Sequence, residues 1–113
     1  MSSVKIERME QIIQKEVSLI IKNEIKDPRL SWVIITDTKV TNDLSFATMY
    51  VSFMQNDSSN QEIFESLEKA KGFIRSKLSS HLKTRKVPQL IFEYDDTLDK
   101  GNRIDELLKN INN

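Results

Sequence analysis

The sequence is poor in several residue types that mark particular classes of protein. It contains no cysteine, two glycines, two prolines and one histidine among 113 residues. The lack of cysteine excludes disulfides, thiolate zinc sites, iron–sulfur clusters and a cysteine nucleophile, and it suits a reducing compartment, so we expect a cytoplasmic protein. The apolar runs fall far short of the ~20 residues of a membrane-spanning helix. We therefore expect neither a membrane span nor a signal peptide.

Motifs that bind nucleotides or metals, or that carry out catalysis, are also missing. The sequence has neither GxxxxGK[ST] nor GxGxxG, the glycine-rich loops that hold nucleotide phosphates. The acidic stretch from Glu93 to Asp96 lacks the spacing and the glycine of a calcium loop. His81 has no acidic neighbour in the sequence to orient it as a base. We expect no enzymatic activity, no cofactor, no metal site and no small-molecule substrate.

Hydrophobic periodicity divides the first half of the chain into a helix and a β-hairpin. Apolar residues at spacings of three and four predict an amphipathic helix over residues 4–26, because the residue before Pro28 is pushed out of the helical region. The β-branched run at residues 32–36, extending to Val40, predicts a strand. The alternation over residues 45–53 predicts a second strand, joined to the first by a turn.

The second half begins with a capping box and contains one unexplained glycine. Ser59 and Glu62 have the spacing of a capping box, and the helical pattern that follows continues to Leu82. Gly72 lies in the middle of this pattern, where it costs roughly 1 kcal/mol relative to alanine. We interpret it as the joint of two helices that meet at a kink; a close-packing glycine within a single helix is the alternative.

The remaining pattern completes one α+β domain. Alternation from Leu90 to Tyr94 predicts a third strand, and the spacing from Ile104 to Ile111 predicts a short terminal helix. The expected order is αββααβ followed by this helix, with a three-stranded sheet packed against helices. Residues 1–113 form a single domain in this interpretation, with a core over about residues 4–96 and a helical tail over about residues 97–113. No exposed apolar stripe demands a dimer, so we expect a monomer.

Charge is distributed unevenly, although the formal net charge is zero. The segment from residue 69 to residue 86 contains seven basic side chains and no Asp or Glu, whereas acidic residues flank it on both sides. A neutral chain of this kind folds into a molecule with a basic pole. The seven cations of this basic block are Lys69, Lys71, Arg75, Lys77, Lys83, Arg85 and Lys86.

The basic block has a functional interpretation and a simpler one. Ile74 and Leu78 are spaced to face the core, so the cations between them project outward as a phosphate-binding surface. A kink at Gly72 adds unpaired N–H groups beside Lys71 and Arg75, which also suit an anion. The simpler alternative is a solvated helix face whose cations offset the helix dipole. We favour RNA as the partner; a module whose basic pole docks an acidic protein is the rival hypothesis.

Two aromatic residues are further candidates for contact with a nucleic-acid base. Trp32 is the only tryptophan, and its position at the start of a strand favours packing over stacking. Tyr50 lies on the polar face of its strand and is the better candidate for stacking on a base.

Six segments spread over nearly the whole chain have a specific combined pattern. They are Arg8 to Glu16, Glu24 to Arg29, Ala47 to Phe53, Ala70 to Arg75, Val87 to Leu90 and Gly101 to Ile104. Together they resemble the bacterial ribosome-binding factor A family. The resemblance implies a type II KH domain in which Ala70, Lys71 and Gly72 form a kink where other KH domains carry a Gly-x-x-Gly loop. It also implies a non-enzymatic factor whose partner is the small ribosomal subunit and its RNA. The sequence departs from some relatives in Ser31 and Trp32, and in lacking a long charged C-terminal extension.

Overall fold

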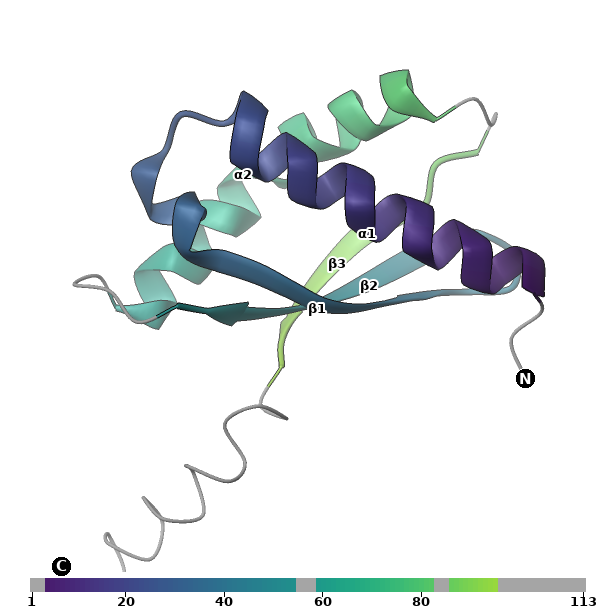
Figure 1. The fold of residues 1–113 in the computed structure, drawn as a ribbon, viewed down its shortest axis with the longest axis horizontal. Coiled ribbons are helices and arrows are strands. Elements are labelled where there is room, and N and C mark those ends of the chain that lie inside the picture. Colours follow the sequence, from purple (N-terminus) through teal and green to yellow (C-terminus); the bar gives the residue numbers. More distant parts are fainter. Residues whose placement is uncertain (1–3, 55–58, 83–85, 96–113) are drawn as a thin grey trace, which may run out of the picture.

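The computed structural model describes residues 4–54, 59–82 and 86–95, which form a three-stranded sheet with two long helices on one face (Figure 1). The elements in chain order are α1 (Val4–Glu24), a short 3-10 helix η1 (Pro28–Trp32), β1 (Val33–Val40), β2 (Phe46–Phe53), α2 (Asn60–His81) and β3 (Gln89–Tyr94). The predicted α+β class, with a three-stranded sheet against helices, is confirmed. The predicted terminal helix lies outside the described residues.

Helix α1 is stabilised by packing its apolar side against the sheet. Ile13, Val17 and Ile20 have no exposed surface and pack into one core with residues of the sheet and of α2. The helix was predicted to extend to Lys26, but α1 ends at Glu24. The chain then enters η1, which the sequence analysis did not anticipate: the Asp27 carboxylate caps it by accepting a hydrogen bond from the Arg29 amide at 3.0 Å.

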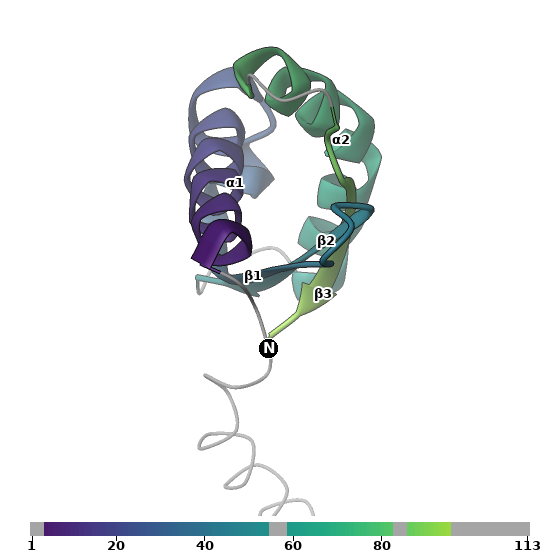
Figure 2. The ribbon, with the colours of Figure 1, turned by 90° about the vertical axis from the view of Figure 1, so that its right-hand side faces the viewer.

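The sheet combines one antiparallel and one parallel pairing. Strands β1 and β2 form the predicted hairpin, and a bulge between Ile35 and Asp37 shifts their register. Strand β3 pairs with β2 in parallel, so β2 is central. A parallel neighbour requires a long crossover connection, and α2 supplies it. Figure 2 shows the result: α1 and α2 lie on the same side of the sheet.

The loop between β1 and β2 is held by a local hydrogen-bond network. The Asp43 carboxylate accepts hydrogen bonds from the Ser45 amide at 3.0 Å and from the Thr41 hydroxyl at 2.9 Å. Hydrogen bonds from Ser45 and then from Thr41 lower the pKa of Asp43 to about 2. Leu44 adopts a left-handed conformation with a φ of 62° and packs partly buried against the core. The network and this packing stabilise a backbone conformation that a leucine rarely adopts.

Helix α2 is continuous where the sequence analysis predicted two helices. Its predicted start is confirmed, since the Ser59 hydroxyl accepts a hydrogen bond from the Glu62 amide at 3.1 Å. No break follows at Gly72, and the observed order is therefore αββαβ, with one helix fewer than predicted. The physical reason is packing: buried residues anchor the helix on both sides of the glycine, against a local cost of only about 1 kcal/mol. The apolar anchors are Ile63, Leu67, Ile74 and Leu78.

The close-packing alternative for Gly72 is wrong as well. A Cβ atom built at Gly72 meets no other atom within 4 Å, so no neighbour requires the absence of a side chain. Both views show the ribbon of α2 changing direction between its two halves (Figures 1 and 2), and this bend is accommodated within one helix. Ala70, the other predicted kink residue, is half-buried and packs against the core.

Substituting Gly72 tests whether α2 needs the glycine. In a continuous helix with open space at this position, Gly72→Ala is expected to raise the free energy of unfolding by about 0.5–1 kcal/mol, as measured by urea denaturation. Ser76→Ala, at another exposed position of α2, is the control for a general gain in helix propensity. A loss of stability in Gly72→Ala would instead show that the bend depends on glycine.

The Asp43 network predicts a pH dependence of stability. The pKa of Asp43 is lower in the folded protein than its usual 3.8, so its charged form stabilises the fold above that value, and this contribution is lost as the pH falls through about 2. Asp43→Ala should therefore destabilise the protein at neutral pH and much less near pH 2, in urea titrations at both values. An equal destabilisation at both values would contradict this account.

Candidate nucleic-acid interface

The cations of the basic block lie on different sides of α2. Successive residues of a helix are rotated by about 100°, so Arg75 and Lys77, two positions apart, point in directions about 160° apart. Arg75 reaches the segment before β3, and Lys77 reaches α1. The sequence analysis placed both on one exposed face; the fold instead distributes them over two flanks of the helix, with Lys69 exposed.

Arg75 holds the connection between α2 and β3. Its guanidinium donates hydrogen bonds to the carbonyl oxygens of Val87 at 2.8 Å and Pro88 at 3.2 Å. Pro88 is among the most deeply buried residues of the chain. The guanidinium thus satisfies two backbone acceptors at the point where the chain enters the sheet, and charged donors make the stronger class of hydrogen bond. Its hydrogen bonds connect two segments of the fold.

The flank of α2 that faces α1 is partly neutralised by acids from that helix. Lys77 lies 3.8 Å from a Glu24 carboxylate oxygen and 5.6 Å from the centre of the Phe73 ring. The Nδ1 atom of His81 lies 2.9 Å from a Glu16 oxygen, and its Nε2 atom lies 3.9 Å from Glu24. Neither acid is near His81 in the sequence. The fold thus gives this histidine acidic neighbours that the sequence analysis did not assign to it.

The other described cations of the block form weaker, more exposed contacts. Lys71 forms an ion pair with Glu68 at 2.7 Å, one turn before it on the same helix, and both side chains are about one-third exposed. The Lys86 ammonium donates to the Asp43 carbonyl at 2.8 Å, which ties the segment before β3 to the hairpin loop. Exposed pairs of this kind contribute at most about 1 kcal/mol, so a phosphate can compete for such a lysine. Lys83 and Arg85 lie outside the described residues.

The two aromatic candidates have different surroundings. Trp32 ends η1 with about one-third of its surface exposed. Tyr50 lies on β2 among the residues that alternate with the buried Met49 and Val51, so it faces the side of the sheet that the helices do not cover. Neither lies on α2 with the basic block, and stacking on a base stays a prediction for both.

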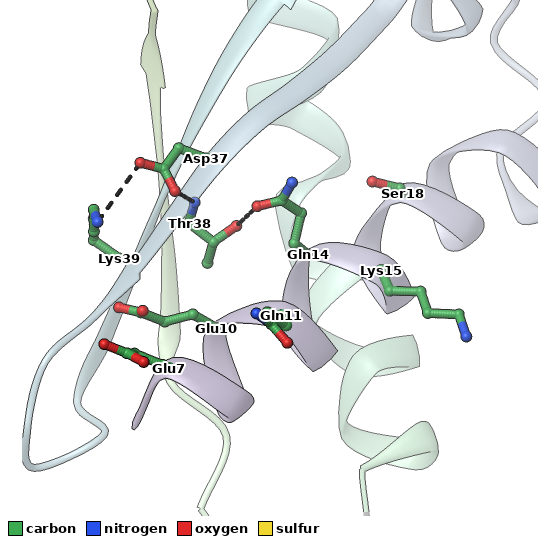
Figure 3. Close-up of a pocket in the computed structure, with 9 residues that line it drawn as sticks. All are labelled: Glu7, Glu10, Gln11, Gln14, Lys15, Ser18, Asp37, Thr38 and Lys39. Carbon is green, nitrogen blue, oxygen red and sulfur yellow. Dashed lines mark hydrogen bonds and ion pairs between the residues drawn. The ribbon is translucent and has the colours of Figure 1, made fainter. Parts of the chain in front are cut away.

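A polar groove runs between α1 and the edge strand β1 (Figure 3). Its floor is made of contacts that hold the helix to the strand: the Thr38 hydroxyl donates to the Gln14 amide oxygen at 3.0 Å, and the Val40 amide donates to the Glu10 carboxylate at 2.8 Å. Three acids and two lysines line it, and one of the acids, Asp37, is paired with Lys39 at 3.7 Å, so the charge of the groove is nearly balanced. No group of three metal-ligating side chains occurs within the described ranges.

A second, more apolar hollow lies near the end of β3. Phe53 and Tyr94 stack there with ring centres 5.7 Å apart, and Phe64 completes the aromatic lining beside two side-chain amides of α2. The surrounding helix turn carries acidic rather than basic residues, including Glu62 and Glu65.

Among helices in the described parts of the chain, none is long and apolar enough to cross a membrane.

The fold defines a small α+β protein with exposed cations on α2, and comparison with known proteins gives its family. The family model of ribosome-binding factor A matches residues 5–108. Ribosome-binding factor A of Staphylococcus carnosus is 43% identical over 111 residues, which cover 98% of this chain and 96% of that protein. The chain belongs to the ribosome-binding factor A family.

Solved structures show the same fold. The crystal structure of ribosome-binding factor A from Thermus thermophilus matches with a TM-score of 0.69 and 19% identity, covering 79% of this chain and 93% of that one. A homology model of the Thermus thermophilus factor, fitted into a cryo-electron microscopy map of its complex with the 30S subunit, matches with a TM-score of 0.60 and 17% identity. It covers 84% of this chain and 96% of that one.

The contacts of Arg75 predict that this residue contributes to stability. Arg75→Ala removes a charged donor from two backbone carbonyls and is expected to lower the free energy of unfolding by about 1–3 kcal/mol in urea denaturation. Lys69→Ala, on the exposed side of the same helix, should change it by less than about 0.5 kcal/mol. Equal effects of the two substitutions would argue against a structural role for Arg75.

Proposed function

We propose that the protein is a non-catalytic assembly factor that binds the free small ribosomal subunit and its RNA and assists late maturation of that RNA. The observation that carries this proposal is membership of the ribosome-binding factor A family, together with the 30S complex of the Thermus thermophilus relative. The proposal includes a type II KH-like domain that acts as a monomer in the cytoplasm. It requires no cofactor, membrane or small-molecule substrate.

The basic block is the proposed RNA-binding surface, with its members in different roles. Lys69 is exposed, and Lys71 is held only by an exposed ion pair, so both are available to phosphates. Arg75 contributes by holding the segment that carries Lys86 against α2. Gly72 leaves the backbone of α2 uncovered between these cations, which lets a bulky ligand approach the helix closely. The remaining proposed contacts are Lys77, Lys83, Arg85 and Lys86.

A factor of this kind works by differential affinity. Since it breaks no bond, it shifts RNA folding only by binding one arrangement of the RNA more tightly than another. Release follows when that arrangement is lost or when a competitor takes the same phosphates.

Salt dependence tests this mechanism directly. If about five phosphates are neutralised, binding to small-subunit RNA should follow a log–log salt slope near −3.5, from about −0.7 per phosphate. The double substitution Lys69→Gln with Lys71→Gln should make that slope shallower by about one to two units. Lys39→Gln removes one positive charge from β1, away from the block, and as the control should leave the slope unchanged.

Sedimentation of tagged protein with ribosomal particles from lysate measures the same interaction in its natural setting. The wild-type protein should be enriched on free small subunits at low salt and lose this enrichment at high salt. Protein that stays at the top of the gradient without RNA, and whose partners are displaced by polyglutamate rather than by RNA, would refute the proposal in favour of an acidic protein partner.

A further inference from the structure

Helix α1 carries a straight row of exposed side chains on the side facing away from the core. Basic residues recur every seven positions, which is two helical turns, so they align along one side of the helix about 10 Å apart. Between them, at spacings of three and four, lie two exposed aliphatic residues. This α1 row consists of Arg8, Ile12, Lys15, Leu19 and Lys22, all of them exposed.

The acidic residues of α1 are directed elsewhere by the fold. Glu10 accepts a hydrogen bond from the backbone of β1, whereas Glu16 and Glu24 face the end of α2. Glu7 lies beside the polar groove (Figure 3). The helix contains four basic and four acidic side chains, so its net charge is zero. Along the α1 row, by contrast, every charged side chain is basic.

The three cations of the α1 row have no ion-pair partner within the described residues. Figure 3 shows the Lys15 side chain extending away from β1, in contrast to Gln14, which points toward Thr38. Unpaired cations on a rigid helix are pre-positioned for an external polyanion. Loss of condensed counterions from such a polyanion then drives binding.

We infer that the α1 row is a second phosphate-binding surface, which takes the backbone of an RNA duplex; this inference rests on the proposed function. Helix α1 contains no aromatic residue on which an unpaired base could stack, so single-stranded RNA has little to bind there. A duplex is recognised mainly by its shape and its phosphates, and a straight row of spaced cations provides such contacts. Ile12 and Leu19, 40% and 41% exposed, provide apolar contact surface between them.

The alternative anionic surface, a lipid membrane, fits α1 poorly. A helix that binds at a membrane interface inserts its apolar face. In α1 that face is occupied, because Ile13, Val17 and Ile20 are fully buried in the core. The exposed side offers only scattered aliphatic side chains among cations. The two helices also lie on the same side of the sheet (Figure 2), so a factor with cations on both can hold two RNA segments together.

The test compares the wild-type protein with a triple variant in which Arg8, Lys15 and Lys22 are each replaced by Gln. Glutamine has a similar helix propensity, so the variants should fold normally, which circular dichroism verifies. Binding to a short mixed-sequence RNA duplex is measured by fluorescence anisotropy over a range of salt. The triple variant should bind about tenfold more weakly or worse, with a slope shallower by about three units. Lys15→Gln alone should lower the slope by about one unit. Lys39 lines the groove beside Lys15 but is paired with Asp37, so Lys39→Gln is the control for an ion-paired neighbour and should not change the slope.

Two outcomes would overturn the inference. One is an unchanged duplex affinity and salt slope in the triple variant. The other is a wild-type protein that prefers single-stranded RNA or phosphatidylserine vesicles to the duplex. Sedimentation with free small subunits separates this inference from the proposed function. If the triple variant matches the wild-type protein both in duplex binding and in sedimentation, only the role of the α1 row as a phosphate-binding surface is refuted. Duplex binding without any small-subunit enrichment of the wild-type protein refutes the proposed function instead.

Discussion

Burial of the apolar stripe of α1 against the sheet is the interaction on which the rest of the structure depends. Both long helices lie on one face of the three-stranded sheet (Figure 2). Helix α1 packs against that face with side chains that have no exposed surface, such as Ile13 and Val17. Fixing that stripe also fixes the rotation of the helix about its axis. Every charged residue of α1 is thereby assigned a direction: toward β1, toward α2 or toward solvent.

The parallel pairing of β2 and β3 imposes the second constraint. It requires α2 to carry the chain back along the sheet, and the connection must return to β3 in a fixed register. Arg75 and Lys86 bind backbone carbonyls along this return, so these two members of the basic block have structural contacts. Lys69, which touches neither flank, has no such constraint. Sequence proximity therefore does not make the cations equivalent.

Local patterns in the sequence predicted most of the elements, because hairpins, caps and amphipathic stripes are local features. The Ser59 cap and the β1–β2 pairing are confirmed. The division of α2 into two helices at Gly72 was wrong, although the helix does bend, because a modest local cost does not break a helix that tertiary packing anchors on both sides. The acidic partners of His81 could not be predicted, since they come from α1, more than fifty positions away. The sequence analysis missed the α1 row because acidic residues separate its cations along the chain. Their seven-residue spacing would have indicated that they share one side of the helix.

Charge sorting allows a chain with no net charge to present cations to the proposed RNA partner. On α1, acids that contact β1 or α2 leave cations along the outward side of the helix, so a phosphate backbone at that side experiences attraction without a large net charge on the protein. Several of these cations, Lys71 and Lys77 among them, already have a carboxylate within reach. In the proposed complex, each of these lysines exchanges an internal ion pair for a phosphate contact, and the gain per contact is smaller than for an unpaired lysine. An affinity built from such exchanges is sensitive to RNA geometry, because a modest displacement of the phosphates returns each lysine to its internal partner.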